Sequence, residues 1–254
     1  MIIISVYNNE KILKAGLLSS DPSVKSLNEI KLVDNTKFQF KSMGQAILSS
    51  TQQFNEDEIL IMCHQDVVFY NAVSFSKISS YVKEIEQNGL FLAGVAGVRK
   101  DLDAKEGIGF NNIVSGGRVL DYLPIDNPEP VDVLDECVII TNKRAICKLK
   151  FFQDDVFDWH LYAADACLAA TQAGIKPYVF PIDINHLGVG KIDKHYFDLS
   201  LELLKKYEVD SLCSTMGILT SRIIYLRRTK LLISDCIQKA WIPIKNVVKF
   251  GSLK

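Results

Sequence analysis

The stretch that decides the fold is Ile59-Leu-Ile-Met-Cys-His-Gln-Asp-Val-Val-Phe69. Its first half is a run of apolar residues, which is typical of a strand buried on both faces of a parallel sheet. Three polar residues, His64, Gln65 and Asp66, then interrupt the run where such a strand would reach its carboxyl end. Ligands of open α/β sheets bind at that edge.

Side chains alternate along a strand, so His64 and Asp66 are expected on one face. An imidazole and a carboxylate side by side could hold a divalent cation or a phosphate-linked group. The alternative is a strand that leaves the sheet through a polar turn, with no ligand. The rest of the chain has to decide between these two interpretations.

Strands and helices are predicted to alternate around this stretch. In chain order they are a strand at 1–7, a helix at 10–18, a strand at 29–33, a helix at 43–53, the strand quoted above, a helix at 74–87 and a strand at 91–98. The connections are short enough for right-handed crossovers, which predicts an α/β fold with a mostly parallel sheet and helices on both faces. The first strand is not followed by Gly-x-Gly-x-x-Gly, and no P-loop motif occurs, so a dinucleotide-binding Rossmann domain and P-loop chemistry are excluded.

The second half of the chain begins with a loop-rich segment from 99 to 130, in which a short hairpin is predicted at 113–120. Beyond it the pattern predicts strands at 130–134, 137–141 and 176–180, helices at 143–149, 159–173 and 193–207, and a loop at 184–190. Asp158 is the expected N-cap of the helix at 159–173. Helical periodicity returns over 212–239, which predicts two parts, an α/β domain at 1–207 and a basic helical extension at 208–254.

Charge is distributed unevenly along the chain. The net charge is −1, which gives no reason to expect a nucleic-acid partner. Residues 221–254, however, hold eight Lys or Arg and one acid, a local net of +7 that leaves −8 for the remainder. A basic amphipathic segment followed by Trp241 and Phe250 suits an anionic membrane surface. The alternatives are a helix packed on the domain with a solvated basic face, and a contact in a homo-oligomer.

The six cysteines form no Cys-x-x-Cys pair and no zinc-like spacing, which fits a reducing cytosol. The N-terminus lacks the pattern of a signal peptide. No stretch approaches the roughly 18 uninterrupted apolar residues of a membrane span. The expected location is therefore the cytoplasm. If the basic segment at 221–254 binds lipid, the protein would attach peripherally to the inner face of the cell membrane.

Polar residues also follow the first two strands, Asn8 and Asn9 after one and Asp34 and Asn35 after the other. Such side chains suit a nucleobase or ribose, although they are also common turn formers. Further along, Asp154, Asp155 and Asp158 precede a helix, where a carboxylate can simply stabilise the helix dipole.

Asp158 beside His160 has the chemical type of a general base. His186 follows a strand in a glycine-containing segment, and a single histidine there is more often structural than a ligand. Together with Asp66 it could complete a site for Mn²⁺ or Mg²⁺, of which Mn²⁺ tolerates imidazole better.

The order of these features resembles that of family 2-type glycosyltransferases of the GT-A fold, and most closely the bacterial "glycosyltransferase-like family" subgroup. The resemblance covers roughly residues 1–190. It rests on Ile3-Ile-Ser-Val-Tyr-Asn-Asn-Glu10, Val33-Asp34-Asn35, Lys41-Ser-Met43, Cys63-His-Gln-Asp-Val67, Asp135 before a strand, Phe157-Asp-Trp-His160 and Asp165-Ala-Cys-Leu-Ala-Ala-Thr-Gln-Ala-Gly174.

The resemblance implies an inverting glycosyltransferase of bacterial polysaccharide biosynthesis, which moves a sugar from a nucleotide-diphosphate donor to a hydroxyl of a surface glycan or a lipid-linked acceptor. It implies Asp158, and next Asp155, as the general base. The metal site, for Mn²⁺ or Mg²⁺, would use Asp66 and His186, and the acceptor side would include Asp135, Trp159 and His160. The residues implied for the nucleotide sugar are Val6, Asn8, Asp34, Asn35, Lys41, His64, Gln65 and Asp66.

Two positions depart from the family pattern. His64 stands where the first aspartate of the family's Asp-x-Asp motif is found, and Tyr162-Ala163 stand where its Glu-Asp pair would fall. These departures keep open a second hypothesis, a catalytically inactive nucleotide-sugar-binding protein that acts as a partner or scaffold. A nucleotidyltransferase is a third, weaker hypothesis, because the first strand is not followed by a Gly-rich basic loop.

Overall fold

The computed structural model describes residues 1–101, 106–115, 118–119, 122–153, 157–188, 192–214 and 217–233. It divides into two compact units. Unit 1 comprises Met1–Gly190 and Cys213–Ile218, and unit 2 comprises Lys191–Leu212 and Leu219–Lys254.

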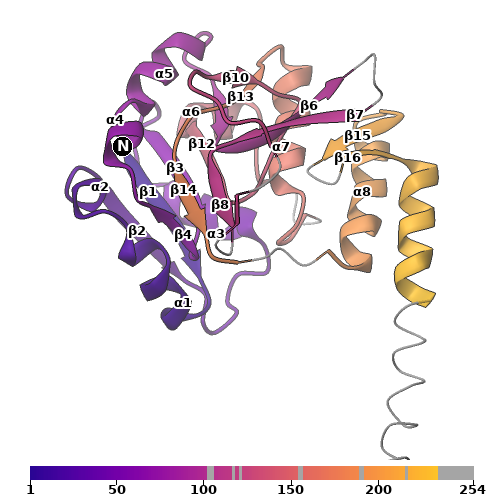
Figure 1. The fold of residues 1–254 in the computed structure, drawn as a ribbon, viewed down its shortest axis with the longest axis horizontal. Coiled ribbons are helices and arrows are strands. Elements are labelled where there is room, and N and C mark those ends of the chain that lie inside the picture. The colour runs from indigo at the N-terminus through magenta and orange to yellow at the C-terminus, as the bar shows by residue number, and fades with distance from the viewer. Residues whose placement is uncertain are drawn as a thin grey trace, which may run out of the picture. The chain divides into compact units, whose positions relative to one another are not determined.

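Unit 1 is built on a seven-stranded sheet in the order β10-β13-β5-β12-β3-β1-β2 (Figure 1). β1 is parallel to both of its neighbours and β13 is parallel to β5, whereas β12 lies antiparallel between β3 and β5. The predicted α/β fold with a parallel-rich sheet is confirmed, with β12 as an antiparallel insertion. The strands are β1 (Ile2–Tyr7), β2 (Glu29–Asp34), β3 (Ile59–His64), β5 (Leu92–Gly94), β10 (Glu129–Pro130), β12 (Val138–Asn142) and β13 (Pro177–Val179).

Helices pack on both faces of this sheet. On one face, Ile3 and Ile61 belong to a buried cluster with side chains of α1, α2, α4 and α5. On the other face, Ile4 and Met62 meet Met43 of α3 around a small cavity. The helices of unit 1 are α1 (Glu10–Ala15), the 3₁₀ turn η1 (Leu17–Ser19), α2 (Pro22–Ser26), α3 (Met43–Thr51), α4 (Ala72–Ser76), α5 (Ile78–Ile85), α6 (Lys143–Lys148) and α7 (Tyr162–Gln172).

Two smaller sheets extend the carboxyl edge. One has the order β11-β6-β7 and the other β4-β14-β8-β9. The single strand predicted at 91–98 is divided at Val95 between β5 and β6, and the predicted hairpin at 113–120 is confirmed as β8 and β9. Their strands are β4 (Val67–Phe69), β6 (Ala96–Asp101), β7 (Glu106–Asn111), β8 (Ile113–Ser115), β9 (Arg118–Val119), β11 (Val133–Leu134) and β14 (Ile184–His186).

The segment 184–190 was predicted as a loop, and for its first three residues this is wrong. β14 pairs antiparallel with β4 and parallel with β8. Three residues are too few to show the alternation by which strands are recognised in a sequence. The pairing matters because it carries His186 to the end of β3.

The start of α7 also differs from the prediction. The helix begins at Tyr162, and its N-cap is Leu161, which has left-handed backbone dihedrals (φ +61°) and makes no side-chain cap hydrogen bond. Asp158 is therefore not the N-cap; its Oδ1 accepts the N–H of Trp159 at 2.6 Å. The N–H groups of Leu161, Tyr162 and Ala163 instead face the carboxyl group of Glu136 and act to lower its pKa.

Unit 2 contains α8 (Lys194–Lys206), whose N-cap Asp193 accepts the N–H of Tyr196, and a helix over 221–233. The two helices are joined by an ion pair between Asp198 and Arg228. The predicted helix over 212–239 is wrong for its first part, where β15 (Ser211–Ser214) and β16 (Gly217–Thr220) form a two-stranded sheet. Among the described residues, no helix is both long enough and apolar enough to span a bilayer.

Candidate functional site

The carboxyl ends of β1, β2 and β3 meet at one edge of the main sheet. Val6 pairs with His64, and Tyr7 pairs with Asp34, so the residues that follow these strands are neighbours. Gln65 ties two of the strand ends together. Its Oε1 accepts the N–H groups of Asn8 and Asn9, both at 3.1 Å, and its Nε2 donates to Asn8 Oδ1 at 2.8 Å.

Asn35, at the end of β2, is 2% exposed and holds its own loop in place. Its Oδ1 accepts the N–H of Phe40 at 2.9 Å, and its Nδ2 donates to the carbonyl of Phe40 at 3.3 Å. Both groups of the Asn35 amide are thus engaged with the loop, which makes this edge of the site rigid. Asp34 acts as a turn former, since its Oδ1 accepts the N–H of Thr36 at 2.8 Å.

A pocket of about 270 Å³ opens at this edge. It combines strand-end amides and a carboxylate with the rings of a tyrosine and a tryptophan. That mixture suits a ligand with both a planar ring and polar groups. The pocket is lined by Val6, Tyr7, Asn8, Asn35, Met43, His64, Gln65, Asp66 and Trp159.

Three side chains at the pocket have the arrangement of metal ligands. His64, Asp66 and His186 each offer one ligand atom, and these atoms lie within 4.8 Å of one another. The register of β14 with β4 sets His186 opposite Val67, and the N–H of Leu187 donates to the carbonyl of Asp66 at 3.0 Å. The short strand β14 therefore completes the cluster.

Gly188 keeps the carboxylate of Asp66 in place. A Cβ atom at position 188 would lie 2.2 Å from Asp66 Oδ2, closer than any real Cβ contact. Because a side chain at 188 would displace the carboxylate, glycine is required by the geometry of the cluster.

The charges within the cluster support one another. Burial raises the pKa of Asp66, but the hydrogen bond from His186 and the nearby imidazoles outweigh burial, so the pKa is lowered overall. Burial lowers the pKa of His186, and its contact with Asp66 (Nε2 to Oδ1, 3.3 Å) outweighs that effect and raises it. The pKa of His64 is lowered, first by burial and then by the charge of His186. The lowered pKa values favour a carboxylate at Asp66 and a neutral imidazole at His64, the states that bind cations, whereas His186 must release its proton before it can bind one.

The donor set fits a divalent cation. Two imidazoles and one carboxylate suit Mn²⁺ and other transition-type ions, whereas Mg²⁺ prefers oxygen ligands throughout. His64, Asp66 and His186 would hold the ion, and the pocket beside them would face its remaining positions. The predicted pair of metal residues, Asp66 and His186, is thus joined in the structure by His64.

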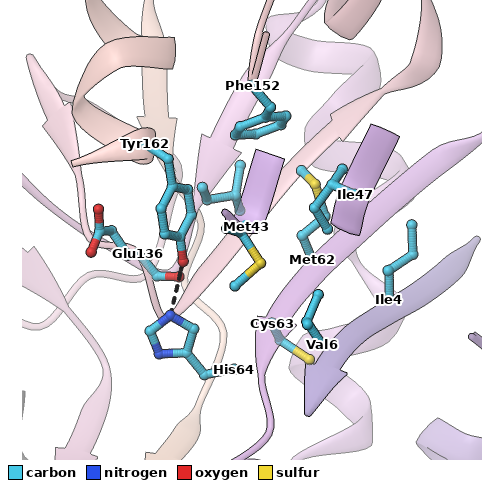
Figure 2. A pocket seen from close by; sticks show the side chains of 11 residues that line it. Ile4, Val6, Met43, Ile47, Met62, Cys63, His64, Glu136, Phe152 and Tyr162 are labelled. Atoms are coloured by element: carbon cyan, nitrogen blue, oxygen red, sulfur yellow. Dashed lines mark hydrogen bonds between the residues drawn. The ribbon is translucent and has the colours of Figure 1, made fainter. Parts of the chain in front are cut away.

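His64 has a buried partner on its far side. Its Nε2 lies 2.9 Å from the hydroxyl oxygen of Tyr162, and that hydroxyl lies 3.1 Å from the backbone carbonyl oxygen of Glu136. Figure 2 shows the Tyr162 hydroxyl pointing at the imidazole, with the Glu136 carboxyl group directed away from this contact. Burial, and then the charge of Glu136, raise the pKa of Tyr162 well above its usual value, so its hydroxyl stays protonated.

The cavity drawn in Figure 2 lies behind His64, between α3 and the sheet, and holds only about 10 Å³. Its volume is close to that of a single water probe, and most of its lining is apolar. A cavity of this size cannot hold more than about one water molecule. It is a packing gap between core side chains and not a ligand site.

The other predicted site residues lie in several places. Asp135 is half-buried, and its Oδ1 accepts the N–H of Cys137 at 2.9 Å. Its charge favours the protonated forms of His64 and His186, although for His64 burial outweighs this effect and the pKa is lowered. Asp158 and His160 are half-buried in the segment before α7, next to the pocket residue Trp159. Lys41 is exposed beside the N-terminus of α3, where its N–H donates to the side chain of Gln45. The prediction for Asp155 falls outside the described residues.

Sequence reasoning missed four residues of this region. Tyr7 and Met43 line the pocket, and Tyr162 and Glu136 support His64. Tyr7 could have been found, because it ends β1 next to Asn8. The role of Glu136 carries no local signal, since its partners lie about 25 residues away at the start of α7.

Comparisons with known proteins place the fold. No protein-family model matches the chain, and no curated protein matches it by sequence. Among solved structures, GalNAc-T7 with UDP, GalNAc and Mn²⁺ aligns with 82% of the chain at a TM-score of 0.53 and 11% identity, and the chain covers 49% of that protein, about half its length. S. aureus TarS in complex with UDP-GlcNAc aligns with 80% of the chain at a TM-score of 0.47 and 12% identity, over 66% of that chain. Unit 1 has the mixed α/β fold of GT-A glycosyltransferases.

Proposed function

We propose that this chain is an inverting glycosyltransferase that moves a sugar from a nucleoside-diphosphate donor to a hydroxyl group of a glycan or lipid-linked acceptor. The observation that carries the proposal is the His64–Asp66–His186 cluster at the mouth of the 270 Å³ pocket. Cation ligands beside a pocket with aromatic and amide walls suit a diphosphate joined to a nucleoside.

Different pocket residues would contact the nucleoside and the diphosphate. Asn8, Gln65 and the loop held by Asn35 would surround the nucleoside, and Tyr7 or Trp159 offers a ring for stacking. A bound Mn²⁺ or Mg²⁺ would supply positive charge to the diphosphate as it leaves. The fold likeness to GalNAc-T7, whose structure holds UDP and Mn²⁺, supports this assignment.

Transfer with inversion requires a carboxylate that takes the proton of the acceptor hydroxyl. We propose Asp158 for this role, with the unplaced Asp155 next. Support for Asp158 comes from its place beside Trp159, and its backbone is anchored because its carbonyl accepts the N–H of Met43 at 2.7 Å. Asp135 is the competing candidate, because its charge reaches both histidines of the cluster. His160 and Trp159 would contact the acceptor.

A thermal-shift screen with UDP-, GDP-, dTDP- and CMP-sugars, with and without Mn²⁺, tests the donor site. A ligand that binds only the folded protein raises its melting temperature by mass action. We expect one nucleotide class to stabilise the wild-type in a Mn²⁺-dependent way, Asp66→Asn to lose that response and the exposed-site control Asp210→Asn to keep it. Equal responses of wild-type and Asp66→Asn would contradict the proposed site.

Release of the nucleoside diphosphate then tests turnover. Asp158→Asn should abolish release while the Mn²⁺-dependent thermal shift persists. Full activity of Asp158→Asn with loss in Asp135→Asn would move the base to Asp135. Donor binding without turnover, over a panel of sugar and lipid-linked acceptors, would favour the catalytically inactive binding protein.

The helix over 221–233 supports a second part of the proposal, attachment to an anionic membrane on the cytoplasmic side. Four of its large apolar side chains are exposed, Tyr225 by 56%, Leu226 by 63%, Leu232 by 39% and Ile233 by 56%. Arg222 and Lys230 are exposed on the same helix. An apolar stripe edged by basic residues suits the boundary between anionic headgroups and acyl chains.

Cosedimentation with phosphatidylcholine vesicles, with and without phosphatidylglycerol, tests this attachment. We expect binding only to the anionic vesicles, weakened by salt and by Leu226→Glu. The matched control is Leu27→Glu, at an equally exposed leucine of unit 1. Equal binding of wild-type and Leu226→Glu would refute the membrane contact, and a concentration-dependent dimer lost in Leu226→Glu would assign the stripe to a homo-oligomer.

A further inference from the structure

We propose that Tyr162 is a positioning residue that selects the tautomer of His64, so that Nε2 carries the proton and Nδ1 is left as the ring atom available to a cation. The inference deepens the proposed cation site and rests on it for its role in metal binding. The tautomer itself can be tested without any metal.

The proton count at the Tyr162 hydroxyl fixes the direction of both hydrogen bonds. The hydroxyl has one proton and two buried neighbours, His64 Nε2 at 2.9 Å and the carbonyl oxygen of Glu136 at 3.1 Å. A carbonyl oxygen can only accept, so the hydroxyl proton points to Glu136. The hydroxyl oxygen must then accept from His64, which requires a proton on Nε2.

The opposite assignment is costly. If Tyr162 donated to Nε2, its oxygen would face the carbonyl oxygen of Glu136 at 3.1 Å with lone pairs on both sides. A buried carbonyl oxygen that faces another lone pair and has no donor is strongly disfavoured. An imidazole that binds a cation is neutral and carries a single ring proton, so a proton on Nε2 leaves Nδ1 with a free lone pair.

The hydroxyl of Tyr162 cannot turn away from His64 easily, because both ends of the residue lie against Glu136. The backbone carbonyl of Glu136 accepts the hydroxyl, and the N–H groups at the start of α7 face its carboxyl group and act to lower its pKa. Tyr162 is 4% exposed, and its ring packs edge-on against Phe152 at 6.2 Å between centroids. Such outer partners fix the orientation of ligand histidines in metal sites.

The same contact links the two positions where the sequence departs from the glycosyltransferase pattern. His64 and Tyr162 are 98 residues apart in the chain and touch each other. A carboxylate ligand has no tautomer to fix. An imidazole such as His64 does, because an acceptor at Nε2 keeps the proton there and leaves Nδ1 able to bind a cation. Tyr162 supplies that acceptor, so the two departures form one coupled feature.

Nitrogen-15 NMR of the histidine side chains, recorded on metal-free protein, tests the tautomer. We expect His64 in the Nε2–H form in the wild-type and in a mixture of both forms in Tyr162→Phe, which keeps the ring and removes the acceptor. The matched control is Tyr81→Phe, on the opposite face of the sheet, which should leave His64 unchanged. A wild-type His64 in the Nδ1–H form would overturn the inference.

Mn²⁺ titration by calorimetry, without nucleotide, tests the consequence for metal binding. Loss of an outer partner typically weakens metal affinity about 10- to 100-fold, and we expect this loss in Tyr162→Phe and not in Tyr81→Phe. Unchanged affinity in Tyr162→Phe would refute the positioning role. A wild-type that binds no Mn²⁺ would instead overturn the proposed cation site, and that result is recognisable because the NMR measurement still reports the tautomer.

Discussion

Glu136 should make the stability of the protein fall as pH rises, and Glu136→Gln should remove this contribution. Its carboxyl group is buried, and its Oε1 atom has no hydrogen-bond partner within the described residues. Burial, and then the charge of Asp135, raise the pKa from 4.5 to about 8, against the lowering effect of the N–H groups at the start of α7.

The direction of the effect follows from the raised pKa. Below pH 4.5 the group is protonated in both folded and unfolded chains, and its contribution is intact. Between pH 4.5 and 8 the unfolded chain releases the proton and the folded chain keeps it, so stability falls as pH rises. At about 1.4 kcal/mol per pH unit, the loss reaches on the order of 3 kcal/mol at pH 7 and approaches about 5 kcal/mol above pH 8.

Urea unfolding of wild-type and Glu136→Gln at pH 5, 6, 7, 8 and 9 measures this loss. Glutamine keeps an oxygen acceptor for the N–H groups of α7 and has no ionisable proton. We expect the variant to gain on the wild-type steadily with pH, by several kcal/mol over the series. The exposed control Glu86→Gln should follow the wild-type. A difference between Glu136→Gln and wild-type that stays constant from pH 5 to 9 would refute the reasoning.

Three further outcomes are expected. Gly188→Ala should weaken Mn²⁺ binding by at least about 10-fold, because the Cβ atom of the alanine would displace the carboxylate of Asp66. Calorimetry measures this loss, and an unchanged affinity would show that the carboxylate is not a ligand. Brief alkylation at pH 8, followed by peptide mass spectrometry, should label the exposed Cys147 before the three buried cysteines of the described residues, and early labelling of those three would contradict the packing of the sheet. Arg228→Ala should lower the stability of unit 2 in thermal unfolding by up to about 1 kcal/mol, because Asp198 loses a partly exposed ion pair, and a larger loss would mean that the arginine also packs.

The parts of the fold that the sequence predicted are those with strong local patterns. The apolar runs of β1 and β3 identify buried strands. Ser42, a residue type that favours N-caps, precedes the helix predicted at 43–53, and its side chain accepts the N–H of Gln45 at the start of α3. The order of these elements is enough to predict an α/β sheet and the edge at which the 270 Å³ pocket lies.

What could not be predicted depends on contacts between distant residues. β14 is a strand because it pairs with β4 and β8. Its three residues are too few to show the alternation of apolar and polar side chains that identifies a strand in a sequence. The first N–H groups of α7 face the carboxyl group of Glu136, a contact between distant residues that no local capping rule identifies. The roles of Asp158 and Asp135 and the division of the chain at residue 207 stay predictions.

The position of β14 has a consequence for folding stability. His186 is separated from Asp66 by about 120 residues of chain, so an ion bound by both would act as a removable cross-link across a long loop, comparable in topology to a disulfide. Such a link forms only in the folded chain and strengthens with ligand concentration, by about 2.7 kcal/mol at a hundredfold excess over the dissociation constant. The concentration of free metal ion would then determine both the stability of the folded pocket edge and its ability to bind a donor.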